Sequence, residues 1–433
     1  MKKLILALVL LPTLVFAQHK ISGTFSPAKQ FKAALLYKLE PAKTVYINNT
    51  TIVDGRFEML LDASVKPGMY RIVYALPQDQ YNFDFIYNNE DVVFDFNANK
   101  GMSFQASKEN ILLNNYKHEM YVVKGKINTL YSDKDIDKAE YTACIKELKE
   151  IQEKAEQASK DMLAYDFIKA SRTYTPNTFE DAATYFNNYK THYFNPIDFS
   201  NPVLQRSGFL MDAAIKYIYT FVDNGHKNTS YKNNIDDVVR ITSKEKAIQK
   251  SILESLWNQF KNKNNEEVTN YIASQHLQKL LDPVKDEILL SDMKAFQNTA
   301  MGATAPDFSW PSKMGSTKLS ELSGKDFYIV TFWSSTCSHC LAELPVLKTY
   351  LSNKKNIQVL AVGLEDEREN WEKTIVDYPD FTQIYGYNKW DNPIPIAYGI
   401  SSTPSFFVLD KDKKIVAKPN DVTALTAYLD SQK

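Results

Sequence analysis

Cysteine is scarce in this chain, with 3 among 433 residues. A secreted scaffold that is stapled by disulfides uses many more, so that class of protein is excluded. Two of the three, Cys337 and Cys340, stand three positions apart, and such a pair indicates chemistry rather than stapling. The third, Cys144, falls on the apolar face of a predicted helix. That position favours a buried structural thiol, and a third redox partner or an intermolecular disulfide is the alternative.

An excess of either charge is also absent, because 51 Lys and Arg residues face 52 Asp and Glu residues. The balance predicts no nucleic-acid partner and no attraction to an anionic membrane. Histidine is rare as well, with 6 residues. Those in the middle of the chain are dispersed without metal-ligand spacing, so no metal site is expected. None of these features indicates an oligomeric state.

Long apolar runs are missing except at the N-terminus, where Lys2 and Lys3 precede the run 4–15 and Ala17 offers a small residue at its exit. This layout predicts a secretory signal peptide over residues 1–17. The run is too short to span a bilayer, which needs about 20 apolar residues. We therefore expect export across the inner membrane, with a periplasmic location. An uncleaved signal would instead leave a membrane tether.

Residues 18–106 alternate apolar and polar positions, and Asp54-Gly55 and Pro67-Gly68 provide turn signals. Short strands at this spacing predict a small antiparallel, β-sandwich-like N-terminal domain. No catalytic cluster stands out in it. The expected strands lie at 34–37, 44–47, 57–61, 70–74 and 92–96.

Residues 107–298 change to the helical spacing that Tyr141, Cys144, Ile145 and Leu148 illustrate. We expect an all-α middle region of five to seven helices. The small, polar segment 298–303 then predicts a boundary into a C-terminal α/β domain over residues 300–433. The chain is thus expected to be a multidomain protein.

The cysteine pair lies at the junction of a predicted strand, 327–333, and a predicted helix that includes 341–351. Free backbone N–H groups and the helix dipole at that junction favour a negative charge. Since the thiolate is the reacting form of cysteine, this position lowers the pKa of Cys337. Cys337 is therefore the expected nucleophile, and Cys340, one turn further on, is expected to resolve the mixed disulfide.

Ser338 and His339 lie between the cysteines and are expected to tune their redox poise, since His339 adds a donor or a positive charge. Competing interpretations of the pair fail on spacing. A zinc site needs a second Cys/His pair, and a c-type haem site needs His where Leu341 stands. A purely structural disulfide stays the alternative.

Four motifs stand in order along residues 302–433: G-x-x-A-P-x-F at 302–308, F-W-x-x-x-C-x-x-C at 332–340, E-x-P at 343–345 and T-P-x-x-F at 403–407. They resemble the motifs of the TlpA/ResA group of the thioredoxin family, although Thr336 replaces the usual Trp. The N-terminal and middle regions also resemble those that precede such domains in secreted Bacteroidetes-type proteins.

The resemblance implies a thioredoxin fold in which Cys337 and Cys340 form a redox-active disulfide. It implies that Pro404 is a cis-proline that leaves the backbone of Thr403 free to pair with a substrate; a plain turn is the alternative. It also implies that Glu343 is a buried carboxylate that relays protons, unless it is an exposed helix residue. Trp333 is expected beside the motif and the substrate, or else in the core.

Together these features predict an extracytoplasmic thiol–disulfide oxidoreductase that reduces protein disulfides. The expected partners are protein disulfide or thiol substrates and a redox partner protein, with no organic cofactor because the thiols hold the electrons. His339 resembles the motif of the oxidant DsbA, so a disulfide oxidase or isomerase stays an alternative. Another alternative is a partner-binding module that carries a redox-sensing thioredoxin domain.

Overall fold

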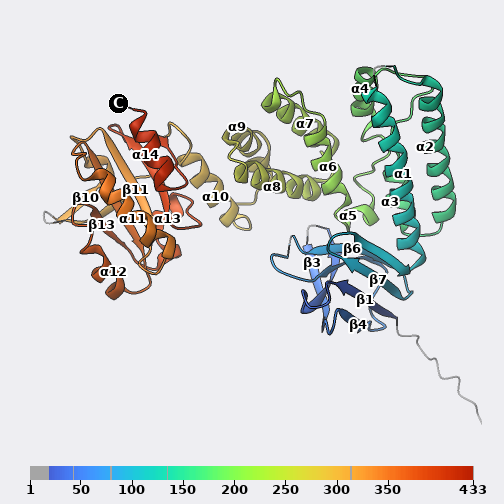
Figure 1. Cartoon of the computed structure of the whole chain (residues 1–433), viewed down its shortest axis with the longest axis horizontal. Helices are drawn as coiled ribbons and strands as arrows, with labels where there is room; N and C mark the ends of the chain where they lie inside the picture. The colour runs from blue at the N-terminus through green and yellow to red at the C-terminus, as the bar shows by residue number, and fades with distance from the viewer. Residues whose placement is uncertain (1–18, 42, 79, 134, 313–314, 433) are drawn as a thin grey trace, which may run out of the picture. The chain divides into compact units, whose positions relative to one another are not determined.

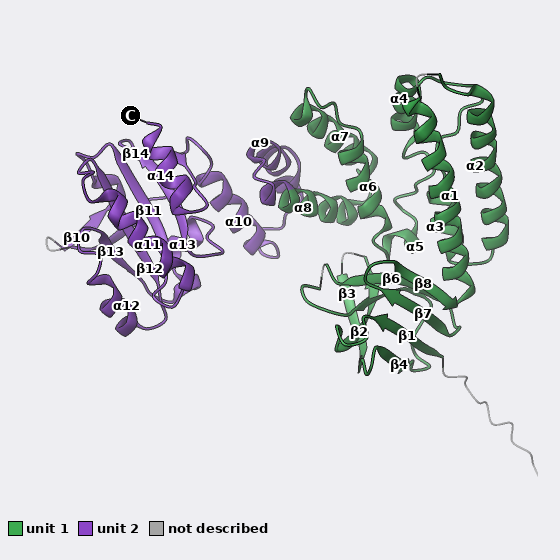
Figure 2. Cartoon of the chain, viewed as in Figure 1, with its two compact units in different colours: residues 1–259 green, residues 260–433 purple. Residues whose placement is uncertain are grey.

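The computed structural model describes residues 19–432 except positions 42, 79, 134 and 313–314. The predicted signal peptide lies outside the described residues. None of the helices in the described part of the chain is long and apolar enough to cross a membrane. The chain forms two compact units, residues 1–259 and 260–433 (Figure 2).

The first unit begins with two four-stranded sheets, ordered β4-β1-β7-β8 and β3-β2-β5-β6 (Figure 1). Side chains from both sheets share one core, which includes Ile21, Leu36, Ile72, Phe85 and Phe94. All five strands predicted here are confirmed, and three more are present. The strands are β1 (Lys20–Ser26), β2 (Ala33–Glu40), β3 (Lys43–Thr51), β4 (Arg56–Leu60), β5 (Gly68–Val73), β6 (Asn82–Tyr87), β7 (Val92–Asn97) and β8 (Gly101–Ala106).

The expectation of purely antiparallel pairing is wrong for one pair, because β1 runs parallel to β7. Parallel neighbours need a long crossover. Here the crossover contains all strands from β2 to β6, so the second sheet is built between two neighbours of the first. Alternation of apolar residues indicates which face of a strand is buried and carries no information on strand direction.

Helices fill the rest of the first unit and continue into the second. The described residues between 107 and 298 form ten α-helices, more than the five to seven expected. Three of these have only 7, 4 and 6 residues, which is too short for the periodic pattern to show. The first eight are α1 (Lys108–Ser132), α2 (Lys138–Ser159), α3 (Ala164–Ala170), α4 (Ala182–His192), α5 (Pro202–Gln205), α6 (Phe209–Thr220), α7 (Lys227–Ile241) and α8 (Lys246–Asn262).

The second unit is built on a five-stranded sheet in the order β13-β12-β11-β14-β15. Strand β11 (Phe327–Trp333) lies in the middle, parallel to β12 (Ile357–Leu364) and antiparallel to β14 (Ser405–Asp410). The remaining elements are α9 (Glu266–Tyr271), η1 (Ile272–His276), η2 (Leu277–Leu280), α10 (Glu287–Asn298), β9 (Ser309–Ser312), β10 (Gly315–Lys318), η3 (Leu319–Glu321), α11 (Ser338–Leu351), α12 (Arg368–Ile375), β13 (Thr382–Gly386), η4 (Lys389–Asp391), α13 (Pro393–Ala397), β15 (Ile415–Ala417) and α14 (Val422–Asp430).

Both faces of this sheet are covered, which explains why β11 is an almost continuous apolar run. Ile329 and Trp333 face one core, together with Leu347 from α11 and Leu425 from α14. The intervening residues, such as Val330, belong to a second core that includes Ala305, Phe308, Trp310 and Leu319. The strand predicted at 327–333 and the helix predicted to include 341–351 are confirmed as β11 and α11.

The boundary between the units falls within α8, so α9 and α10 belong to the unit that contains the five-stranded sheet. Side-chain contacts explain this. Lys418 forms an ion pair with Glu266 of α9 and lies 5.9 Å from the centre of the Phe296 ring in α10. The N–H of Met301 also donates to Glu266, at 3.1 Å. The finer division at residues 106 and 298 stays a prediction.

Candidate functional site

Cys337 is the N-cap of α11, at the end of the turn that leaves β11. The backbone N–H of Cys340 donates to the Cys337 sulfur at 3.2 Å. The structure pairs the two residues as a disulfide, with their Cα atoms 5.3 Å apart. Cys337 is half-buried, whereas Cys340 has no exposed surface. Cys337 is thus the sulfur that a partner can reach, and its position at a helix start favours the thiolate.

Ser338 and His339 occupy the first turn of α11, and both are exposed. They follow the half-buried Cys337 directly in sequence. Their side chains are therefore available to any molecule that approaches the pair.

Thr403 and Pro404 come from the loop before β14, far from Cys337 in sequence. The peptide bond between them is cis, as the resemblance implied. The carbonyl oxygen of Thr403 lies 3.5 Å from the Cys337 sulfur. The fold therefore brings this backbone segment beside the nucleophile, and both residues are half-buried.

Glu343 lies one turn after Cys340 on α11 and is half-buried rather than fully buried. Its Oε2 accepts a hydrogen bond of 2.7 Å from the N–H of Val422, the first residue of α14. This contact provides an acceptor for one of the backbone N–H groups at the start of α14, which have no partner within the helix. The residue is neither the exposed helix residue nor the completely buried acid that were considered.

Trp333 is fully buried, in the core that also contains Cys340. A side chain with no exposed surface presents nothing to a substrate, so of the two expectations the core position describes the structure. Thr331 of β11 is also fully buried.

Glu365 is a site residue that the sequence did not reveal. It follows β12 directly, is 4% exposed, and accepts hydrogen bonds from the backbone N–H of Ser335 and, at 3.3 Å, from the hydroxyl of Ser334. These two serines form the turn that leads to Cys337. The carboxyl ends of parallel strands meet at one sheet edge, so an acid directly after the strand next to β11 was the available signal.

We expect Glu365→Ala to lower the free energy of unfolding by about 1–3 kcal/mol, because it removes a buried acceptor from the active-site turn. Alkylation of the reduced Cys337 thiol should also change in rate as the turn loosens. Glu365→Gln keeps one acceptor oxygen and should lower the free energy of unfolding by less. Glu367→Ala, at an exposed position two residues on, is the matched control. Equal effects of the two alanine substitutions would show that Glu365 does not hold the turn.

Cys144 lies buried on α2 and forms no disulfide. Burial raises the pKa of its thiol, which disfavours the reactive thiolate. These observations agree with a structural thiol.

Comparisons with known proteins show which proteins the second unit is similar to. Residues 324–415 match the family described as Thioredoxin-like. The chain is 29% identical, over 127 residues, to the thiol-disulfide oxidoreductase ResA of Geobacillus thermodenitrificans, an alignment that covers 27% of this chain and 67% of that protein. It is also 29% identical to the thioredoxin domain of a thiol-disulfide oxidoreductase from Bacteroides vulgatus, covering 31% of this chain and 97% of that one with a TM-score of 0.27.

A thioredoxin-like protein from Bacteroides caccae aligns over 60% of this chain and 96% of its own length, with 17% identity and a TM-score of 0.42. On the sequence matches the C-terminal domain is TlpA/ResA-like, and the chain is a thioredoxin-like thiol–disulfide oxidoreductase.

Proposed function

We propose that this protein reduces the disulfides of other proteins outside the cytoplasm, with Cys337 and Cys340 as its redox pair. The observation that carries the proposal is the difference in exposure between the two cysteines. Cys337, the N-cap of α11, is partly exposed, whereas Cys340 is fully buried. A nucleophile must meet its substrate, whereas a resolving thiol needs only to meet the mixed disulfide.

In the proposed reaction, the Cys337 thiolate attacks one sulfur of a substrate disulfide, and the other substrate sulfur leaves as a thiolate that takes up a proton. Cys340, once deprotonated, then attacks the Cys337 sulfur. This step releases the second substrate thiolate and leaves Cys337–Cys340 as a disulfide. The substrate has gained two electrons, and a dithiol partner protein restores the enzyme. No organic cofactor takes part.

Glu343 is the proposed proton acceptor for Cys340. The two residues are three positions apart on α11 and therefore lie on the same side of the helix. The backbone of Thr403 beside Cys337 is the proposed contact for the substrate chain, next to Pro404. Ser338 and His339 are the proposed tuning residues.

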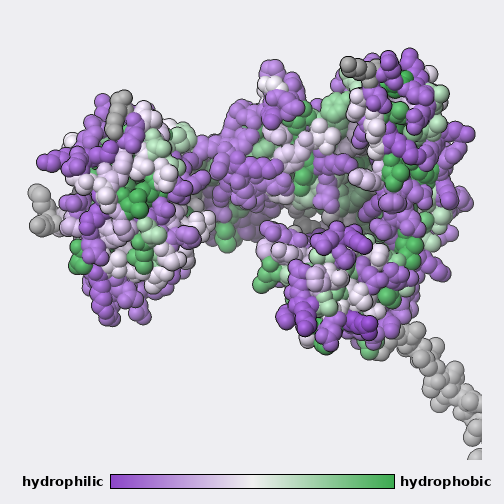
Figure 3. All heavy atoms as spheres, viewed as in Figure 1, coloured by the Kyte–Doolittle hydropathy of each residue, from purple (hydrophilic) through white to green (hydrophobic). Residues whose placement is uncertain are grey.

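Exposed apolar side chains on the helix that carries Cys340 support a protein substrate. Leu341 and Val346 of α11 are 42% and 57% exposed, and Figure 3 shows hydrophobic surface over the part of this unit where α11 lies. Exposed apolar surface on this helix suits a partially unfolded or extended substrate protein. We also propose that residues 1–17 direct export, and that a β-sandwich-like domain (18–106) and a helical domain (107–298) precede the catalytic domain.

The reduction potential of the Cys337–Cys340 pair tests the direction of electron flow. We expect a value near that of thioredoxin, roughly −270 mV, as equilibration with glutathione or dithiothreitol measures it. A value near that of DsbA, roughly −120 mV, would overturn the proposal in favour of disulfide oxidation. His339→Ala should make the potential more negative if His339 stabilises the reduced thiolate.

A further inference from the structure

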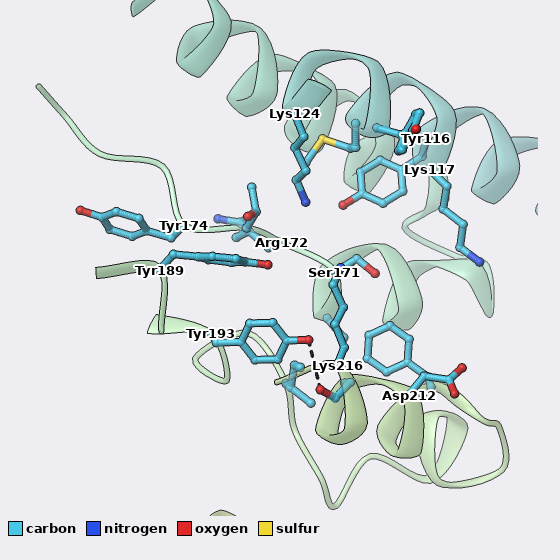
Figure 4. A pocket seen from close by; sticks show the side chains of 17 residues that line it. Tyr116, Lys117, Lys124, Ser171, Arg172, Tyr174, Tyr189, Tyr193, Asp212 and Lys216 are labelled. Atoms are coloured by element: carbon cyan, nitrogen blue, oxygen red, sulfur yellow. Dashed lines mark hydrogen bonds between the residues drawn. The ribbon is translucent and has the colours of Figure 1, made fainter. Parts of the chain in front are cut away.

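A pocket of about 360 Å³ opens among the helices of the first unit (Figure 4). Helix α1 lines one side and α6 the opposite side, and the segment after α3 and the end of α4 complete it. Its size falls in the range of small-molecule sites, roughly 300–1,000 Å³. All of its lining residues belong to this one unit, and the proposed thiol chemistry does not use them.

Two lysines from opposite walls meet in this pocket. Lys124 extends from α1 and Lys216 from α6, so that their ammonium groups approach the same space (Figure 4). In the described part of the chain, neither ammonium forms an ion pair. Two like charges that face a shared cavity attract an anion into it.

The other charged residues of the pocket already have compensation. Arg172 is held from outside by Glu156, whose two carboxylate oxygens accept its N–H groups at 2.8 and 2.7 Å. Lys117 interacts with Asp212, the one acidic residue among the described residues that line the pocket. The uncompensated positive charge is therefore that of Lys124 and Lys216.

The ammonium form of Lys124 is disfavoured in this pocket. Burial and, as the smaller cause, the nearby charge of Lys216 together lower the pKa of Lys124 to about 8. A bound anion would remove part of this cost, since it supplies the opposite charge that both lysines lack.

Aromatic side chains form the wall beside these lysines. The rings of Tyr189 and Tyr193 lie 5.7 Å apart, and Figure 4 shows both at the same side of the pocket. The hydroxyl of Tyr193 donates to the carbonyl oxygen of Ala213 at 3.1 Å, which fixes this ring in place. Such rings offer flat, apolar surface to the body of a ligand.

We propose that this pocket binds a small organic anion with a flat, apolar body. The anionic group lies between Lys124 and Lys216, and the body lies against Tyr189 and Tyr193. The site is independent of the cysteine pair, so loss of either function leaves the other testable.

The test uses the full-length protein and two fluorescent probes that differ by one charge, anilinonaphthalenesulfonate and the uncharged phenylnaphthylamine. We expect the sulfonate to bind saturably. Replacement of both lysines, K124M together with K216M, should weaken its binding roughly tenfold or more, because two charged donors are lost. Binding of the uncharged probe should change little.

K124R together with K216R keeps both charges and should bind the sulfonate within a few-fold of the wild type. This variant separates loss of charge from loss of folding, which the urea midpoint reports for each protein. K154M removes an exposed lysine on α2, outside the pocket, and is the matched control. Unchanged sulfonate binding in the double Met variant, or equal wild-type affinity for both probes, would overturn the proposal.

The sulfonate affinity should also fall as the pH rises through about 8, because Lys124 then loses its charge. A bound anion favours the protonated lysine. The contribution of Lys124 to the affinity is therefore complete below that pH and is lost as the pH rises above it. K124M should lack this pH dependence; an identical profile in K124M would contradict the role of Lys124. The other titratable groups that line the pocket are Tyr116, Lys117, Tyr121, Arg172, Tyr174, Tyr189, Tyr193, Asp212 and Lys216.

Discussion

Cys337→Ser should lower the rate of insulin disulfide reduction, with dithiothreitol as the electron source, by roughly a thousandfold or more, to the uncatalysed background. The hydroxyl that replaces the thiol does not ionise at neutral pH and cannot form a mixed disulfide. Cys337 is the only one of the two motif cysteines with exposed surface, so Cys340 cannot take over the attack. Turbidity of the precipitating insulin chains measures the rate.

Two further variants make this result specific. Cys340→Ser keeps the nucleophile and removes the resolving thiol, so it should accumulate a mixed disulfide that a non-reducing gel detects. Cys144→Ser is the matched control and should retain the wild-type rate, because Cys144 is buried and its thiol pKa is raised. If Cys337→Ser and the wild type reduced insulin equally fast, this result would contradict the assignment of Cys337 as the nucleophile.

The reacting cysteines were predictable because their setting is local in sequence. An apolar run that ends in a short turn before a helical pattern places Cys337 at a helix start, and the structure confirms this as the N-cap of α11. Glu365 was not predictable in the same way. Its contact with Ser335 depends on β12 lying beside β11, and a pairing of strands 30 residues apart leaves no periodic signal.

The same distinction applies to the N-terminal sheets. Burial patterns located the strands, since alternation reflects the two faces of each strand. The parallel neighbours β1 and β7 are separated by the whole second sheet, so only the three-dimensional structure shows them as a pair. Likewise, ion pairs such as Lys418–Glu266, which join α9 to the segment after β15, connect positions that are remote in sequence.

Trp333→Ala should lower the free energy of unfolding of the second unit by about 3–5 kcal/mol, the largest stability change that we predict. Trp333 is fully buried and packs with Leu344, Leu347 and Cys340. Its removal leaves a cavity next to the strand end that carries the active-site turn. Hydrogen exchange of the peptides that cover residues 327–351, followed with increasing urea, measures the change in this unit separately from the other.

Trp390→Ala is the matched control, because this tryptophan is 41% exposed and lies outside that core. Trp390→Ala should change the free energy of unfolding by close to zero, as is usual for surface substitutions. The cavity left by Trp333→Ala borders Cys340, whose thiol should then be alkylated faster in the reduced protein. If Trp333→Ala lowered stability without exposing Cys340, the tryptophan would support the fold alone. Faster alkylation would show that the core side chain also keeps the resolving thiol away from solvent, so that only Cys337 meets the substrate.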